Sequence, residues 1–243
     1  MTRGILDGRH VVVVMLASVL GIMLVTAGAA GAQDGGIVVG TVTFVGEPPP
    51  PGEPTRNTVN PEVCGEAIRP RSLVVVGLDN GLQHAVVRIV GARGSVSAPA
   101  DAPTLGQKGC RFSPHVVVIG TGQRLDVLND DGILHNIHTH SEVNQEMNVG
   151  HPGFLQKISL RAFQKPEIFR VGCDIHLWMS AWIVVTDSSF VAVTDENGAF
   201  SITGVPPGTY QMTVWHEQLG EQTQEIVVTA GQETTSSFEL TAN

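Results

Sequence analysis

Short alternations of apolar and polar residues dominate the chain beyond its N-terminal region. Segment 37–45, for example, has Val38, Val42 and Phe44 on one face and is followed by Gly46. Alternation with a period of two is typical of a strand that buries one face. Because no stretch shows a convincing helical period, the sequence predicts an all-β protein.

Similar segments recur to the end of the chain. Strands are predicted at 72–76, 85–90, 115–119, 124–128, 182–186, 190–194, 199–203, 210–216, 223–229 and 234–240. Turn signals rich in Asn, Asp and Gly separate several of them, as at 129–132. Segment 140–154 is polar and irregular and is predicted to be a loop. The regular rhythm after residue 190 is typical of a small antiparallel sandwich.

The N-terminus has the pattern of an export signal. Arg3 and Arg9 precede an apolar run over 11–25, and small residues then lead to Ala30-Gly31-Ala32. We expect residues 1–32 to be a cleaved signal peptide and the protein to be periplasmic or secreted. An uncleaved anchor is the alternative, although the run is short for a membrane span. We expect no stable membrane span after cleavage.

The charge balance narrows the choice of partner. Residues 33–243 carry 22 acidic and 12 basic side chains, a formal charge of −10. This balance argues against a nucleic-acid partner, because binding to phosphates needs a basic surface. It suits the steering of a basic protein partner, and it suits a simple role in solubility equally well.

The segment from Cys173 to Met179 combines three metal-binding side chains in a C-x2-H-x2-M spacing, and His135 lies upstream at the end of a strand-like run. Two imidazoles, a thiolate and a thioether are the ligands of a blue copper centre, in which a trigonal His2Cys plane carries a long axial Met. A lone Cys or Met is more typical of a core side chain. The combination favours one type 1 copper ion bound by His135, Cys173, His176 and Met179.

The other two cysteines, Cys64 and Cys110, have no metal-ligand context. In an oxidising compartment they are the natural disulfide pair. The bridge would close a loop of about 46 residues. By reducing the entropy of the unfolded chain, it would add roughly 4 kcal/mol to the free energy of unfolding. Cys173 is then an odd thiol that needs an explanation, and copper binding supplies one.

Residues 85–186 resemble the plastocyanin-like cupredoxins, and the short ligand loop is most similar to the amicyanin branch. The resemblance extends beyond the four ligands to Phe112-Ser113-Pro114 and to Gly122-x-x-Leu125-x-Val127-x-Asn129. It implies a Greek-key sandwich with the four ligands around copper and Met179 in the axial position. It also implies that Asn136 hydrogen-bonds across to the cysteine loop and fixes the ligand geometry.

The ligand loop departs from the amicyanin pattern in one respect. Ile175 and Leu177 stand where amicyanin-like loops often have prolines beside the second histidine. The stiffness of those loops is therefore not expected of this one. In the family the edge of that histidine, here His176, reaches the surface and passes the electron. Leu177 and Trp178 would then form an apolar docking patch for a protein redox partner.

Residues 190–243 resemble a second family, the transthyretin-like or carboxypeptidase-regulatory-like sandwich. The runs 193–202 and 205–210 carry this resemblance, which implies a fold and no catalysis.

We therefore expect a cupredoxin domain with an N-terminal extension at 33–187 and a small β-sandwich at 188–243. Such sandwiches usually need a first strand of the type seen at 37–46. The alternative is that the copper unit is inserted into the small sandwich, which would bring 37–46 beside the C-terminal strands.

The other histidines support weaker hypotheses. His138 and His140 form an H-x-H pair that, with His151, is either a second metal site or a set of solvated loop side chains. A trinuclear oxidase centre needs more histidines than remain after two are assigned to the blue copper site.

Met147 is a competitor for the axial position, although Met179 is favoured because it lies on the same short loop as two other ligands. Cys173 could instead be a catalytic nucleophile. Met179 would have no role in that chemistry, which argues against this interpretation.

Three functional hypotheses emerge from these patterns, and none of them is enzymatic. The first is a one-electron carrier with a protein redox partner. The second is an exported copper store or donor that uses the same ligands. The third is a non-redox module in which the β-sandwiches bind a partner.

Overall fold

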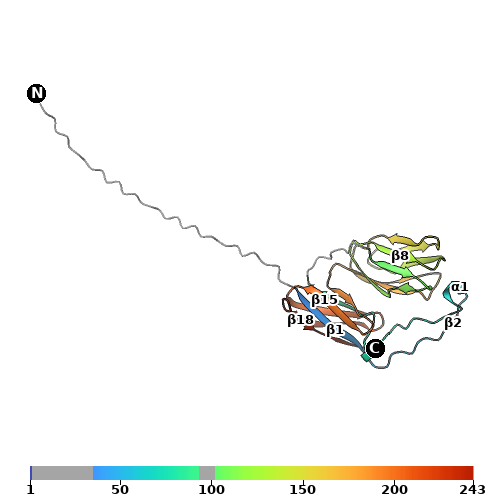
Figure 1. Ribbon diagram of the computed structural model, residues 1–243, viewed down its shortest axis with the longest axis horizontal. Helices are drawn as coiled ribbons and strands as arrows, with labels where there is room; N and C mark the ends of the chain where they lie inside the picture. The colour runs from blue at the N-terminus through green and yellow to red at the C-terminus, as the bar shows by residue number, and fades with distance from the viewer. Residues whose placement is uncertain (2–34, 93–101, 243) are drawn as a thin grey trace. The chain divides into compact units, whose positions relative to one another are not determined.

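The computed structural model describes Met1, residues 35–92 and residues 102–242 (Figure 1). The expected signal peptide, residues 1–32, lies outside these residues apart from Met1. In the part of the chain that is described, no helix is long and apolar enough to cross a membrane.

Strands account for most of the regular structure in the described residues. Their bounds are β1 (Gly36–Val45), β2 (Thr55–Arg56), β3 (Ala67–Ile68), β4 (Val86–Val90), β5 (Thr104–Gln107), β6 (Phe112–Ser113), β7 (Val116–Gly120), β8 (Leu125–Asn129), β9 (His135–Thr139), β10 (Asn148–His151), β11 (Lys157–Leu160), β12 (Glu167–Gly172), β13 (Ser180–Thr186), β14 (Val191–Val193), β15 (Ala199–Val205), β16 (Gly208–His216), β17 (Gly220–Val228), β18 (Glu233–Thr235) and β19 (Phe238–Thr241). The helical segments are α1 (Pro61–Cys64) and the 3₁₀-helix η1 (Leu78–Asn80). The prediction of an all-β protein is confirmed.

Three predicted segments differ from the observed strands. Segment 72–76 forms no strand and makes one isolated bridge, from Val76 to Leu82. Segment 140–154 contains β10, a mostly exposed edge strand whose polar residues give no apolar alternation. Segment 234–240 is divided into β18 and β19.

The division between β18 and β19 has a steric origin. The carbonyl of Ser236 approaches β1 so closely that a Cβ added to Gly40 would lie 1.8 Å from its oxygen. Only glycine allows the two backbones to come this near.

Two sheets enclose a first core, and we call this unit the first sandwich. One sheet has the order β10-β9-β12-β13-β7 and the other has the order β11-β8-β5-β6. The β7–β13 and β5–β8 pairs are parallel, whereas β12 runs antiparallel to both β9 and β13. The buried cluster between the sheets includes Leu105, Phe112, Leu125, Ile137, Phe163 and Ile183.

Two further sheets form a second sandwich around a separate core. In one of them β1 lies between β15 and β18 and also pairs with β19, and the other has the order β14-β4-β16-β17. The inward residues predicted for the first strand, Val38, Val42 and Phe44, are all buried in this core.

The second sandwich joins strands from both ends of the chain. β1 pairs antiparallel with β15 and parallel with β18 and β19, the pairing expected if the first sandwich is inserted into the second. The resemblance to cupredoxins had included segment 85–90 in the copper unit. That assignment is wrong, because β4 hydrogen-bonds to β14 and β16 of the second sandwich.

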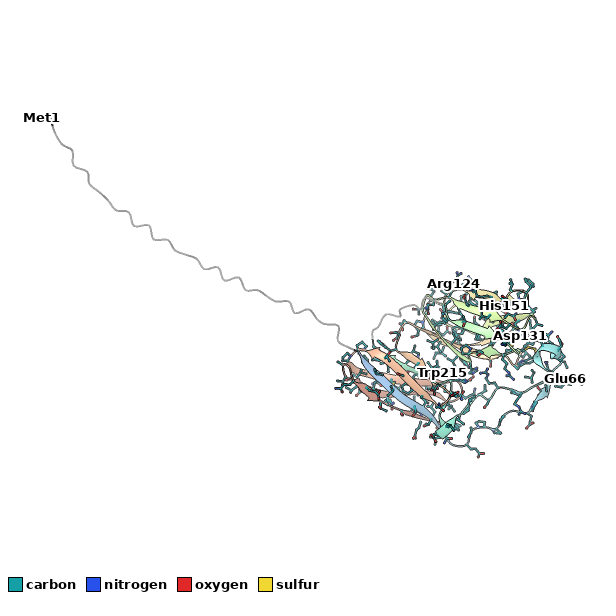
Figure 2. The ribbon with its side chains drawn as sticks, in the orientation of Figure 1. Met1, Glu66, Arg124, Asp131, His151 and Trp215 are labelled. Atoms are coloured by element: carbon teal, nitrogen blue, oxygen red, sulfur yellow. A yellow bond between two sulfur atoms is a disulfide. The ribbon has the colours of Figure 1, made fainter. Side chains whose placement is uncertain are left out.

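The two sandwiches share a third apolar cluster. Val116 of β7 and Val184 of β13 meet Val86 of β4, while the alternate residues of β7 and β13 face the first core. Near-continuous apolar runs are typical of strands that are covered on both faces. The indole rings of Trp182 and Trp215 meet edge to face here, with centroids 4.9 Å apart (Trp215 is labelled in Figure 2).

A buried carboxylate adds a polar link between the sandwiches. Glu217, which follows β16, accepts hydrogen bonds from Nε2 of His115 and, at 2.7 Å, from Nε1 of Trp182. The side chains of His115 and Glu217 are 1% and 8% exposed. Burial raises the pKa of Glu217, but the hydrogen bonds from His115 and Trp182 more than offset it and leave the pKa below its usual range.

Replacing this carboxylate should destabilise the fold. Glu217→Ala leaves the His115 and Trp182 donors without their acceptor, at a cost of about 1–3 kcal/mol for each. Urea unfolding should therefore show a loss of several kcal/mol in the free energy of unfolding. The control is Glu221→Ala, which breaks an exposed pair with Arg88 and should cost about 0–1 kcal/mol. Equal losses in the two variants would contradict the assigned role of Glu217.

Candidate metal centre

β9 and the loop after β12 bring the predicted ligands together. β9 begins at His135, and β12 ends at Gly172, directly before Cys173. Gly172 pairs with His138 of β9, so the ligand loop starts beside that strand. Ligand atoms of His135, Cys173 and His176 all lie within 4.8 Å of one another, and the three side chains are buried.

The imidazole of His135 is held at one nitrogen and open at the other. Its Nε2 lies 3.0 Å from Oδ2 of Asp131 (labelled in Figure 2), which also accepts from the backbone N–H of Cys110. A carboxylate beside Nε2 keeps the proton there and leaves a lone pair on Nδ1. Nδ1 of His135 is buried and has no hydrogen-bond partner, which is the property expected of a metal-binding nitrogen.

His176 is oriented in the same way. Its Nε2 donates to Oδ1 of Asn60 at 3.2 Å, whereas its Nδ1 lies 3.8 Å from Sγ of Cys173. The backbone N–H of His176 also donates to that sulfur, at 3.4 Å. The rings of His135 and His176 have centroids 4.7 Å apart. Two imidazoles and one thiol sulfur therefore lie close together, a donor set that fits a copper ion.

Burial favours the ligating form of both rings. It lowers the pKa of His135, and the hydrogen bond to Asp131 only partly opposes this. Burial and then the neighbouring His135 lower the pKa of His176. Both shifts favour the neutral imidazole, which is the form that binds metals.

Met179 closes the ligand loop. Its backbone N–H donates to the carbonyl of His176 at 2.8 Å, and its side chain is 1% exposed. Met179 and Met147 both belong to the buried cluster that contains Cys173. Only Met179 lies on the same short loop as Cys173 and His176, so it stays the favoured axial candidate.

Asn136 connects β9 to the ligand loop. Its Oδ1 accepts from the backbone N–H of Asp174 at 2.7 Å, and its Nδ2 donates to the Asp174 carboxylate at 3.0 Å. This is the cross-connection that the resemblance implies, directly beside Cys173. Its role in fixing the ligand geometry stays a prediction.

A segment before the first sandwich covers the second histidine. The predicted disulfide between Cys64 and Cys110 is present, and both sulfurs lie within 4.8 Å of a ring nitrogen of His176. The indole of Trp178 donates to the carbonyl of Cys110 at 3.0 Å. We call α1, the disulfide and Asn60 the cap.

The cap corrects one expectation. The resemblance implied that the edge of His176 reaches the surface, but the residue is 0% exposed. The reason is that Asn60 occupies the outer nitrogen of the ring and the disulfide holds α1 in place. Sequence reasoning missed Asn60, which is far from His176 in sequence, and Asp131, which lies four residues before His135 in a segment interpreted only as a turn.

The remaining histidines separate into two environments. His138 and His140 lie close to Glu146, which sequence reasoning did not name. His151 is not part of that group. It is fully buried, pairs across the strands with His135, and has no hydrogen-bond partner at either ring nitrogen.

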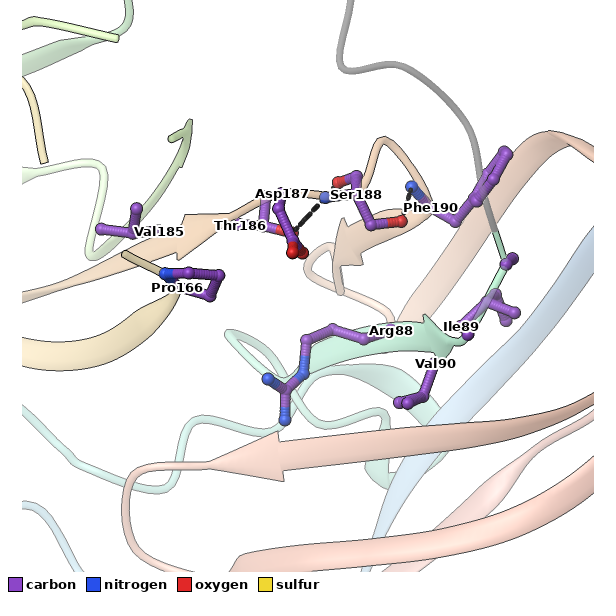
Figure 3. A pocket seen from close by; sticks show the side chains of 11 residues that line it. Arg88, Ile89, Val90, Pro166, Val185, Thr186, Asp187, Ser188 and Phe190 are labelled. Carbon is purple, nitrogen blue, oxygen red and sulfur yellow. Dashed lines mark hydrogen bonds between the residues drawn. The ribbon is translucent and has the colours of Figure 1, made fainter. Parts of the chain in front are cut away.

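A hollow of about 730 Å³ lies away from all of these residues (Figure 3). Its lining includes Arg88, Pro166, Asp187 and Phe190 and none of the predicted ligands. Arg88 is engaged by Glu221 at 2.6 Å. We therefore attach no metal chemistry to this hollow.

Comparison with known proteins gives a partial picture. No curated protein matches the chain. A protein-family profile described as "Polysaccharide lyase family 4, domain II" matches residues 175–236. The match spans well under half of the chain, and the resemblance of 190–243 to carboxypeptidase-regulatory-like sandwiches stays a prediction.

Solved structures that resemble the chain include copper proteins. A Cu-containing nitrite reductase from Thermus scotoductus SA-01 is 21% identical over 41% of this chain and 25% of its own, with a TM-score of 0.32. Amicyanin from Paracoccus versutus is 16% identical over 41% of this chain and 97% of its own, with a TM-score of 0.29. A purple cupredoxin from Nitrosopumilus maritimus is 18% identical over 35% of this chain and 100% of its own, with a TM-score of 0.30.

These likenesses are too low to carry an argument about function. The chain spans only a quarter of the length of the nitrite reductase. Any functional assignment therefore rests on the residues of this chain.

Removing the disulfide should weaken the fold measurably. The bridge joins residues 46 apart in sequence, so the variant Cys64→Ala/Cys110→Ala should lose about 4 kcal/mol in the free energy of unfolding. A dithiol reductant should destabilise the native chain and Cys173→Ser alike, and should leave the double variant unchanged. Guanidinium unfolding with and without reductant measures this. A reductant effect that persists in the double variant would contradict the account.

Proposed function

We propose that the chain is an exported type 1 copper protein that carries one electron at a time. His135, Cys173 and His176 would form the ligand plane and Met179 the axial contact. The observation that carries the proposal is the approach of donor atoms from three buried side chains to within 4.8 Å of one another, together with a buried Nδ1 of His135 that has no hydrogen-bond partner. Buried polar nitrogens are rarely left unpaired without a functional reason.

The donor types suit an ion that changes its charge. Thiolate and thioether sulfurs favour Cu(I), and imidazoles suit Cu(II), so the combined set holds either state. Copper supplies the reversible one-electron step. The chain supplies a dry, preformed pocket, because each of the proposed ligand side chains is at most 3% exposed.

Hydrogen bonds around the pocket support a fixed geometry. Asp131 and Asn60 hold the outer nitrogens of the two histidines, and Asn136 holds the backbone next to Cys173. Partners of this kind orient ligands and tune the metal. A pocket that does not rearrange between oxidation states favours rapid electron exchange, which fits a carrier better than a catalyst.

The cap closes the electron route that the resemblance implies, which runs through an exposed edge of His176. Since His176 is covered, a redox partner cannot touch its ring directly. Leu177, the next residue, is 76% exposed and provides an apolar contact beside the site. The half-buried Trp178 links the same loop to the cap through the carbonyl of Cys110. We propose that the partner docks on Leu177 and exchanges the electron across this single layer of protein.

A copper store or donor is the second candidate, because the same donor set would serve it. The cap favours the carrier over a donor, since a covered, fully buried site releases its metal slowly. The third hypothesis, a non-redox binding module, has no contact in its favour among the described residues.

The oxidised, copper-loaded chain should be intensely blue and should bleach when ascorbate is added. Cys173→Ser should abolish the colour, because the thiolate contact to copper is lost, while one copper ion can still be bound. Met147→Leu is the matched control for Met179→Leu: the first should leave the absorption maximum unchanged, and the second should shift it. Visible absorption with metal analysis measures all three variants against the native chain.

A colourless chain that nevertheless contains copper would refute the type 1 assignment. Repeated cycles of ascorbate and oxidant in the presence of a copper chelator separate the two candidate functions. A carrier keeps its colour through many cycles. Loss of copper to the chelator within the first cycles would instead identify a donor.

A further inference from the structure

A second group of side chains with potential metal ligands lies near the end of β9 and in the segment that follows it. His138, His140 and Glu146 each offer a ligand atom, and these atoms lie within 4.8 Å of one another. Nε2 of His138 is 2.7 Å from Oε1 of Glu146, and the rings of His138 and His140 have centroids 4.4 Å apart. Unlike the buried ligand pocket, this group is partly or fully exposed to solvent.

A carboxylate orients the first of these imidazoles. Nδ1 of His138 lies 2.9 Å from Oδ1 and 3.1 Å from Oδ2 of Asp174. Asp174 is itself fixed by side-chain amides of Asn136 at 3.0 Å and Asn148 at 2.7 Å. A carboxylate on one nitrogen that directs the other outward is the usual arrangement behind a metal-binding histidine. In this case Nε2 is directed toward Glu146.

The loop that carries Glu146 is also fixed. The Glu167 carboxylate accepts hydrogen bonds from the hydroxyl of Ser141 at 2.5 Å and from the backbone N–H groups of Glu142, Val143 and Asn144 at 2.7–3.2 Å. Burial raises the pKa of Glu167, but these donors lower it to about 2. The carboxylate therefore stays ionised and holds segment 141–144 next to the end of β9.

The backbone that carries the second imidazole is also held in place. The backbone N–H of His140 donates to the carbonyl of Arg170 at 2.9 Å, which fixes the backbone of His140 beside β12.

We propose that His138, His140 and Glu146 form a second metal site for a divalent transition-metal ion of borderline softness, such as Zn²⁺ or Cu²⁺, with Asp174 as the positioning residue for His138. Imidazole and carboxylate ligands suit these ions, and three protein ligands leave a coordination position for water or a small ligand. The site is exposed, so the ion exchanges with solvent without passing the cap.

This inference is independent of the type 1 assignment. None of its three ligands belongs to the buried pocket, although Asp174 is the neighbour of Cys173 in sequence. The second site should therefore persist in a chain that can no longer form a blue centre.

The test is calorimetric titration of Zn²⁺ into the copper-loaded chain and, in parallel, into the His135→Ala/Cys173→Ser chain, whose buried site has lost two of its donors. Each should bind one Zn²⁺ at this site. His140→Ala and Glu146→Gln should each weaken the binding at least tenfold, and Asp174→Asn should weaken it by about 10–100-fold. Glu142→Gln is the matched control, because Glu142 is an exposed carboxylate of the same loop that uses only its backbone N–H in the fold. It should leave the affinity unchanged.

A second readout separates ligation from altered folding. Electron paramagnetic resonance of one Cu²⁺ in the His135→Ala/Cys173→Ser chain should show nitrogen coupling that weakens when His140→Ala is added, while circular dichroism stays native. Zn²⁺ binding that is absent, or that is equal in His140→Ala, Glu146→Gln and Glu142→Gln, would overturn the proposal. A missing blue colour with intact Zn²⁺ binding would count against the type 1 centre only.

Discussion

We propose that the metal centre depends first on the hydrogen bonds between Asn136 and Asp174. They join β9, which carries the upstream histidine, to the loop that carries the other ligands, at 2.7 Å through the backbone and 3.0 Å through the side chains. The two segments are far apart in sequence, and β-pairing between β9 and β12 extends only over two residue pairs. Asp174 also bonds to His138 of β9 and to Asn148 of β10, so its carboxylate holds the start of the ligand loop against these strands.

Around this connection the chain fixes both histidines from outside. Asp131 restrains one ring and Asn60 the other, and both anchors depend on the Cys64–Cys110 bridge. Asp131 accepts from the backbone of Cys110, and Asn60 precedes α1, which ends at Cys64. The disulfide is therefore a structural element of the pocket as well as a constraint on the unfolded chain. The same contacts cover His176 and explain why the site has no exposed imidazole edge.

The sequence predicts those parts of this arrangement that are local. The C-x2-H-x2-M spacing predicts a single loop of donors, and alternation predicts the inward face of β1. The lack of metal-ligand context around Cys64 and Cys110 predicts the bridge. Long-range partners leave no such signal. Asn60 and Glu146 are ordinary polar residues in loops, and their roles arise only from tertiary contacts. The strand β4 has the same alternation whether it pairs within the first sandwich or the second, so periodicity alone could not assign it.

The claim that three buried donors are poised for one copper ion is tested most directly by X-ray absorption at the copper edge, on the full chain loaded with one equivalent of copper. The account predicts a first shell of one strongly bound sulfur and two imidazole nitrogens, with little change in distances between the oxidised and the reduced protein. A first shell made only of nitrogen and oxygen neighbours, or one that rearranges on reduction, would contradict it.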